Sequence, residues 1–338
     1  MSADSPAALG YAMPAEWASH ARCWMAWPCR AALWGERLGA ARAAYAEVAR
    51  AIARFEPVTM VAHPDDALIA RGMLGAGVPV LALPLDDSWM RDIGPSFVAH
   101  PARGLAGVAW RFNAWGGKYA DYADDARLAR RLLAHLKLPR FEAPLVLEGG
   151  AIHVDGAGSV LVTEQCLLNP NRNPGLSRAT IEDHLRAWLG VETVIWLGQG
   201  LIDDETDGHV DNLACFVRPG VVMALSEDDP ADANFAALAD NRARLAAARD
   251  ARGRALEIIP VHQPAARHVE GRRLALSYIN FYRANGGVVA PRFGDPRDAE
   301  FEATLARALP DLAIAPVAVG DILFGGGGIH CITQQQPA

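Results

Sequence analysis

Lysine is almost absent from this chain, which has only Lys118 and Lys137 among its 32 basic residues. The 39 acidic residues outnumber the basic ones, so the net charge is −7, and no long basic run occurs. A negative field repels the phosphates of nucleic acids and of anionic lipids. We therefore expect neither a nucleic-acid partner nor a membrane partner.

Long hydrophobic runs and targeting signals are also missing. No uncharged apolar run reaches the roughly 18 residues that a membrane span requires, and residues 1–10 lack the basic-then-apolar order of a signal peptide. The five cysteines contain no C-x-x-C pair and no even disulfide framework. These absences predict a cytoplasmic protein whose thiols are free for chemistry.

The composition, with 51% hydrophobic and 21% charged residues, is typical of a folded enzyme. Apolar stripes predict helices over 41–55, 64–74, 124–136, 177–189, 231–248 and 298–309. Short apolar runs predict strands over 57–63, 78–83, 107–113, 143–150, 193–198, 220–225, 255–261 and 312–319. Because similar modules recur without a linker, we expect one closed α/β domain of repeated strand–strand–helix–strand units over residues 1–338.

Polar residues gather beside glycines in four segments, 86–95, 148–153, 203–211 and 324–336. In the last one, Cys331 follows a run of four glycines, which could present its thiol at the floor of a pocket. The alternative is a buried cysteine in a short final strand. A reactive thiol needs a base or a nearby positive charge to ionise.

His209 is the best candidate for that base. Asp211 follows two residues later and would share a face with it if a strand began at Val210. The alternative is a hydrogen-bonded surface histidine. The acidic residues around His209 would repel one another unless a cation or ordered waters balanced them; they are Asp203, Asp204, Glu205, Asp207 and Asp211.

A planar organic cation fits these carboxylates better than a metal ion. The acidic run lacks the ligand order of a calcium loop, and His-x-Asp is weak evidence for zinc. A guanidinium group matches a fork of carboxylates, and Trp89 and Trp115 could stack on its plane. Asp92 could join this set, or it could simply pair with Arg91.

Taken together, these motifs resemble the agmatine deiminases, within the guanidine-modifying superfamily that includes arginine deiminases, peptidyl-arginine deiminases and amidinotransferases. The matching segments occur in order along the chain: 13–17, 24–28, 87–95, 112–117, 147–153, 171–174, 204–212, 278–282 and 327–337. The resemblance implies a five-module, pseudo-symmetric α/β propeller of ββαβ repeats. It also implies that neither a metal nor an organic cofactor is required.

By position, the resemblance assigns Cys331 as the nucleophile and His209 as the general acid/base. It implies that Asp92 and Asp211 bind the guanidinium nitrogens, while Glu148 orients His209.

The resemblance also places Glu205 near the far amine of the substrate and Trp89 along the substrate channel. One departure stands out, because the family usually reads Gly-Asn-Ile-His-Cys where this chain has Gly328 instead of the asparagine. Loss of that amide could loosen the loop behind the cysteine or alter the substrate preference.

The implied reaction is hydrolysis of agmatine to N-carbamoylputrescine and ammonia through an amidino-cysteine intermediate, a step of putrescine and polyamine biosynthesis. Several alternatives stay open: deimination of arginine or peptidyl-arginine, amidino transfer, guanidine binding without catalysis, and a metal site built on His209 and Asp211. A homo-oligomer is also left open.

Overall fold

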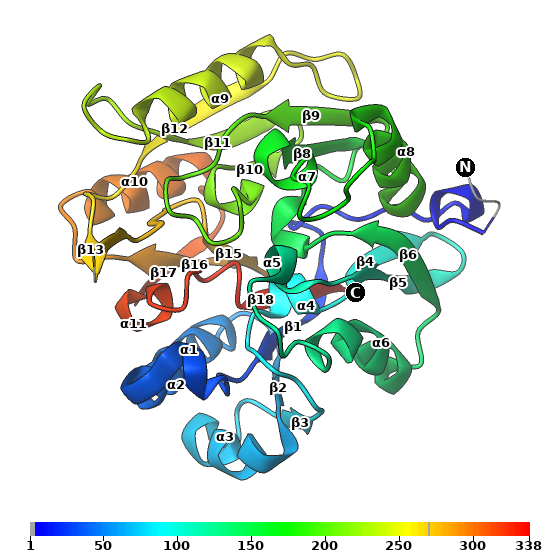
Figure 1. Ribbon diagram of the computed structural model, residues 1–338, viewed down its shortest axis with the longest axis vertical. Coiled ribbons are helices and arrows are strands. Elements are labelled where there is room, and N and C mark those ends of the chain that lie inside the picture. Colours follow the sequence, from blue (N-terminus) through cyan, green and yellow to red (C-terminus); the bar gives the residue numbers. More distant parts are fainter. Residues whose placement is uncertain (1–3, 270) are drawn as a thin grey trace.

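The computed structural model describes residues 4–269 and 271–338, and its modules surround a common centre (Figure 1). In each module the first two strands pair antiparallel, and the third joins the second in parallel after a helix. Four modules follow one another along the chain. The first consists of β4 (Ser96–His100), β5 (Gly104–Arg111), α6 (Asp125–Leu136) and β6 (Arg140–Val146), and the second of β7 (His153–Val154), β8 (Ser159–Thr163), α8 (Arg178–Leu189) and β9 (Thr193–Leu197). The third consists of β10 (Ala214–Arg218), β11 (Val221–Ser226), α9 (Phe235–Ala247) and β12 (Glu257–His262), and the fourth of β15 (Tyr282–Ala284), β16 (Gly287–Arg292), α10 (Asp298–Ala308) and β17 (Ala313–Ala318).

The fifth module joins the two ends of the chain. The last strand, β18 (Thr333–Pro337), pairs antiparallel with β1 (His20–Ala26), which pairs in parallel with β2 (Val58–Ala62) after α2 (Leu38–Ile52). Helix α3 (Ala67–Leu74) and strand β3 (Val80–Ala82) extend this sheet to four strands. The predicted five-module propeller is therefore confirmed.

Hydrophobic periodicity explains the elements that were predicted correctly. Helix α2 buries one face through residues spaced three or four apart, among them Ala41, Tyr45, Val48 and Ile52. All five residues of β2 are buried, as expected for a strand with a parallel neighbour on each side. The module helices α2, α6, α8, α9 and α10 lie on the outside of the ring in Figure 1.

Most predicted boundaries were wrong by one to three residues, and two were wrong by four. The helix expected over 231–248 begins only at Phe235, because the Asp229 and Asp232 side chains accept hydrogen bonds from backbone N–H groups two residues ahead and hold the chain in turns. The strand expected over 143–150 ends at Val146, and a 3₁₀ turn, η4 (Gly149–Ala151), follows it.

The segments that precede the first strand of each module come together at the centre. They are α4 (Met90–Ile93) before β4, η4 before β7, η5 (Val210–Asn212) before β10, residues 277–281 before β15, and residues 329–332 before β18. Figure 1 shows α4 and β18 close to this centre. Module repetition thus brings residues far apart in the sequence to one place.

The remaining elements are short connections and additions around the modules. They are η1 (Ala7–Leu9), α1 (Ala31–Trp34), η2 (Gly35–Arg37), η3 (Pro64–Asp66), α5 (Ala114–Gly117), α7 (Glu164–Leu167), the hairpin strands β13 (His268–Val269) and β14 (Arg272–Arg273), and α11 (Gly320–Leu323).

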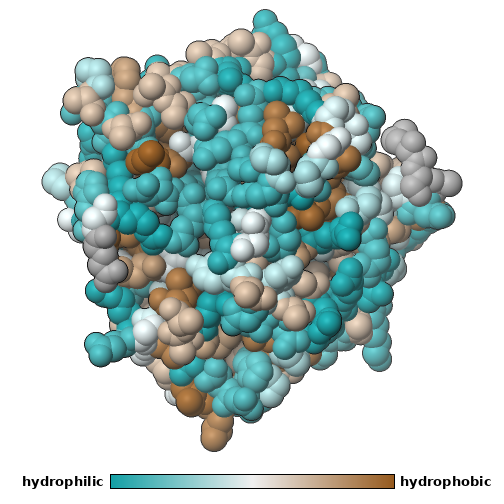
Figure 2. All heavy atoms as spheres, in the orientation of Figure 1, coloured by the Kyte–Doolittle hydropathy of each residue, from teal (hydrophilic) through white to brown (hydrophobic). Residues whose placement is uncertain are grey.

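The face seen in Figure 2 is largely hydrophilic, with separate hydrophobic patches. One of them, at the bottom of the view, lies over α3, where Leu68, Ile69 and Met73 are exposed. Among the described residues, no helix is long and apolar enough to cross a bilayer.

Candidate active site

The five predicted catalytic residues are all buried and lie in the central segments. Asp92 is in α4, Glu148 directly precedes η4, Asp211 is in η5, and His209 and Cys331 lie just before η5 and β18. His209 and Glu148 are fully shielded from solvent, and Cys331 is 4% exposed. Because these side chains are buried before the first strands of four modules, only a ligand that enters the centre can reach them.

Gly150 marks the point at which these side chains meet. A Cβ atom at this position would lie 2.6 Å from His209 Nδ1, 3.0 Å from Asp211 Oδ2 and 3.1 Å from Asp92 Oδ1. The same Asp211 oxygen is 3.5 Å from Cys331 Sγ. The structure thus brings the sulfur, the imidazole and two carboxylates together around a position where a side chain has no room.

The segment around Asp211 differs from the sequence expectation. Residues 210–212 form the 3₁₀ turn η5 and not the start of a strand, so His209 and Asp211 do not share a strand face. The turn still directs both side chains to the centre. The alternative pairing of Asp92 with Arg91 is also wrong, because Arg91 Nη1 pairs with Glu16 at 3.3 Å.

Two donors fix the Asp92 carboxylate. Trp115 Nε1–H donates to Oδ2 at 2.8 Å, and the Gly150 N–H donates to Oδ1 at 2.9 Å. Trp115 holds a left-handed backbone conformation with φ 53° and ψ 42°, which is costly for a bulky residue. This strained position aims the indole at the carboxylate.

Arg172 anchors Glu148 beside the imidazole. Its Nε–H donates to Glu148 Oε1 at 2.7 Å, and both side chains are fully buried. The other oxygen, Oε2, lies 3.6 Å from His209 Nε2, which is longer than a hydrogen bond. Within the described part of the chain, both imidazole nitrogens and Asp211 Oδ1 lack hydrogen-bond partners, so they can bind substrate or water.

Burial and neighbouring carboxylates set the protonation of the central groups. Burial alone would lower the pKa of His209, but the charge of Asp92, with further help from Cys166 and Glu148, raises it well above 6.5. Burial, together with the charges of Asp211 and Asp92, raises the pKa of Cys331 well above 9.0. The imidazole is therefore a proton donor at neutral pH, while the sulfur needs added positive charge to ionise.

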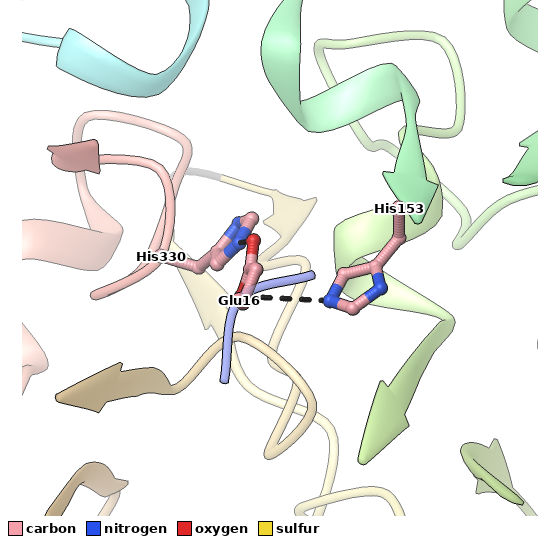
Figure 3. Close-up of side chains that lie close together, drawn as sticks. All are labelled: Glu16, His153 and His330. Carbon is pink, nitrogen blue, oxygen red and sulfur yellow. Dashed lines mark hydrogen bonds and ion pairs between the residues drawn. The ribbon is translucent and has the colours of Figure 1, made fainter. Parts of the chain in front are cut away.

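A chain of buried charged groups extends behind Asp211. His330 Nδ1 lies 2.8 Å from Asp211 Oδ2, and its Nε2 lies 2.8 Å from Glu16 Oε1. Figure 3 shows Glu16 between His330 and His153, whose Nε2 is 3.5 Å from Glu16 Oε2. Burial and Arg91 would lower the pKa of His330, but Glu16 and Asp211 raise it, so the imidazolium keeps Asp211 ionised.

A cavity with about 360 Å³ of empty space leads to the sulfur. Its lining consists of Trp89, Asp92, Trp115, Lys118, Tyr119, Glu205, Thr206, Gly325, Gly326, Gly327 and Cys331. Trp89 also packs against the glycine run, because a Cβ at Gly327 would lie 2.6 Å from its ring. The cavity therefore contains each of the predicted substrate-binding residues except Asp211, which lies behind the sulfur.

Two of the acidic residues near His209, Asp207 and Glu205, pair with lysine or arginine side chains. Asp207 pairs with Lys118 Nζ at 3.1 Å and with Arg172 Nη1 at 2.9 Å. Glu205 forms an ion pair with Arg272 and accepts a hydrogen bond of 3.4 Å from the Tyr119 hydroxyl. Two members of the cluster are therefore balanced by basic side chains of the chain itself.

Two groups of described side chains could offer three metal ligands: Glu16, His153 and His330, and Glu148, Cys166 and His209. In each group the carboxylate already pairs with an arginine, Arg91 or Arg172, whose charge would repel a divalent cation. Asp211 belongs to neither group. The arrangement therefore gives no support to a metal site built on His209 and Asp211.

The sequence did not single out Arg172, Glu16, His153 or His330 as functional. The motif segments contain all four residues, but their roles depend on contacts with residues distant in the sequence. A signal was available for His330, because it directly precedes Cys331 after the glycine run.

Comparison with known proteins places this geometry in a family. The family model of the Porphyromonas-type peptidyl-arginine deiminases matches residues 12–337. The chain belongs to this family.

Relatives of this deiminase match along almost the whole chain. The agmatine deiminase of Stutzerimonas stutzeri (strain A1501) is 48% identical over 359 residues, covering 99% of this chain and 98% of the relative. That of Medicago truncatula is 42% identical, with the same coverage of both chains. A solved structure of the agmatine deiminase of Enterococcus faecalis is 36% identical and covers 100% of this chain and 98% of its own, with a TM-score of 0.95.

Proposed function

We propose that this deiminase hydrolyses the guanidinium group of agmatine to give N-carbamoylputrescine and ammonia. The observation that carries the proposal is the convergence of Cys331 Sγ, His209, Asp92 and Asp211, with Cys331 and Asp92 lining one cavity. The named agmatine deiminases that match over nearly the whole chain support the same activity.

In the proposed reaction, Asp92 and Asp211 hold the guanidinium so that its carbon faces the sulfur, which makes the attack nearly unimolecular. The bound cation lowers the pKa of the thiol and so generates the thiolate of Cys331. Sulfur adds to the carbon, and His209 protonates one nitrogen, which leaves as ammonia. An amidino-cysteine remains.

Water then completes the cycle. His209 takes a proton from the water, whose oxygen bonds to the same carbon, and the carbon–sulfur bond breaks. The products are the ureido compound and the free thiolate. Glu148, facing the other side of the imidazole, orients His209 for both proton transfers.

The tail of the substrate would extend toward Glu205, whose carboxylate suits the ammonium of agmatine. Lys118 lines the same cavity, and Arg272 pairs with Glu205. These two cations favour a second candidate, a guanidine substrate that ends in a carboxylate, such as arginine. The two substrates are separated by comparing their kcat/KM values with the same enzyme preparation.

We also propose that residues 1–338 form one catalytic domain that works in the cytoplasm on a small-molecule substrate. Pairing of β18 with β1 supports the single domain, and five free cysteines support a reducing compartment. Assembly into a homo-oligomer stays a prediction.

The test is incubation of the purified protein with agmatine, arginine and a peptidyl-arginine, with ammonia and the ureido product measured. We expect agmatine to be consumed and Cys331→Ser to fold normally while releasing no ammonia. Cys215→Ser, at a buried thiol outside the cavity, is the matched control and should keep its activity. Turnover retained in Cys331→Ser would exclude the covalent route.

A further inference from the structure

One of the five central segments contributes no residue to the predicted site. The segments before β4, β7, β10 and β18 supply Asp92, Glu148, His209 with Asp211, and Cys331. The segment before β15 has the equivalent position in its module, and it contains Asn280, which is 2% exposed. Because the other four segments supply site residues, Asn280 is a candidate site residue as well.

The Asn280 side chain connects the nucleophile to the neighbouring segment. Its amide Nδ2–H donates to Cys331 Sγ at 3.1 Å and to Asn212 Oδ1 at 3.0 Å. Its Oδ1 accepts from the backbone N–H of His330 at 2.9 Å and of Cys331 at 3.3 Å. One buried amide thus fixes both the backbone and the sulfur of the cysteine.

Glycine at position 328 leaves room for this amide. A Cβ at Gly328 would lie 2.5 Å from Asn280 Oδ1 and 2.9 Å from its Cγ. Any larger residue would have to displace the Asn280 side chain. In this chain the glycine and the Asn280 amide therefore pack directly against each other.

We propose that Asn280 is a positioning residue that directs the Cys331 sulfur toward the substrate cavity and stabilises its thiolate. The proposal rests on Cys331 being the nucleophile of the proposed function.

The charges around the sulfur make this hydrogen bond important. The titratable and charged groups of the central segments around Cys331 are Asp92, Arg91, Glu148, His209, Asp211 and His330. Asp211 and Asp92 oppose ionisation of the thiol, whereas the Asn280 amide lowers its pKa. A neutral donor supports the thiolate without adding a positive charge that would compete with a guanidinium for the carboxylates.

Alkylation tests the proposal without reference to any substrate. The rate of reaction with iodoacetamide is followed against pH in the wild type, Asn280→Ala and Asn280→Asp, and the signal of Cys331→Ala is subtracted. We expect Cys331 to react about tenfold more slowly at pH 7 in Asn280→Ala, because the charged thiolate loses one hydrogen bond. The midpoint of its alkylation should also move to higher pH. Asn280→Asp should titrate higher still, because its carboxylate adds negative charge.

If Asn280 had only a structural role, its variants would have a lower melting temperature but the same pH midpoint of Cys331 alkylation. That result would overturn the proposal. If the aspartate variant does not fold, Asn280→Ala carries the same test. If the alkylation midpoints rise in the order wild type, Asn280→Ala, Asn280→Asp while agmatine is not consumed, the role of Asn280 is supported and only the proposed substrate is rejected.

The close contact between Gly328 and Asn280 is tested with a matched pair. Gly328→Ala should lose at least about tenfold in alkylation rate, because the new methyl group displaces the amide. Gly320→Ala is the control, since its Cβ meets no atom within 4 Å and its rate should not change. In the Asn280→Ala background, Gly328→Ala should add little further loss; full additivity of the two losses would contradict the coupling.

Discussion

The ion pair of Arg172 with Glu148 gives the most direct test of the electrostatic account. Arg172 donates to Glu148 at 2.7 Å, to Asp207 at 2.9 Å, to the Asn171 side chain at 2.8 Å and to the Thr206 carbonyl at 3.0 Å. Arg172→Met keeps the stem but leaves the Glu148 carboxylate buried without its cation. Loss of one partner of a buried pair costs about 3–5 kcal/mol.

This loss should depend on pH with a definite sign. Burial alone would raise the pKa of Glu148, but Arg172 and His209 keep it below 4.5 in the wild type. The pair therefore adds stability above about pH 4.5, and this contribution is lost as the pH falls through the lowered pKa. Without Arg172 the pKa rises above 4.5, so the difference between variant and wild type should grow from pH 5 to pH 7.5.

Urea unfolding followed by circular dichroism at the two pH values measures this difference. The matched control is Arg130→Met, because Arg130 pairs with Glu142 at 2.8 Å but the two side chains are 41% and 43% exposed. We expect the control to lose no more than about 1 kcal/mol. Equal losses in the two variants, or a loss in Arg172→Met that is independent of pH, would refute the reasoning.

Two further predictions concern groups around the carboxylates. Trp115→Phe removes the hydrogen bond to Asp92 and should raise the KM for agmatine about tenfold, whereas Trp110→Phe, which loses a 2.9 Å bond to Ser96, should leave steady-state kinetics unchanged. The raised pKa of His330 means that its two ion pairs stabilise the fold fully below about pH 6.5 and lose this effect as the pH rises through that pKa. Melting curves should therefore show the largest gap between wild type and His330→Gln between about pH 4.5 and 6.5, and a gap that widens above pH 8 would contradict this assignment.

Sequence patterns were sufficient for the six long helices and the repeat, because apolar periodicity depends on neighbours in the chain, but they gave no range for the first strand of any module, β4, β7, β10, β15 or β18. They were less reliable where polar side chains reorganise the backbone locally. The helix that starts at Phe235 is delayed by aspartate turns, and η5 replaces the strand expected from Val210. In both places side-chain hydrogen bonds or turn geometry determine the local conformation, and apolar spacing contains no information about them.

The site likewise contains features that the sequence predicts and features that it does not. Motif order identified the residues that meet at the centre, but it could not assign partners. Arg91 pairs with Glu16, 75 positions away in the chain, and Glu205 pairs with Arg272 of the hairpin. Such pairings depend on how modules face one another, which a single sequence does not encode in any local pattern.

The electrostatics of the centre also explain why its residues are reactive only together. Asp92 and Asp211 are needed to bind a guanidinium, yet both raise the pKa of the Cys331 thiol. Arrival of the cation reverses this effect, because it neutralises the carboxylates and places positive charge beside the sulfur. The thiolate is then populated mainly when substrate is bound, and an empty site keeps its nucleophile protonated. Alkylation of Cys331 should therefore have its midpoint at a lower pH in enzyme saturated with a non-hydrolysable cation that has an amine tail than in the free enzyme, and an unchanged midpoint would contradict this account.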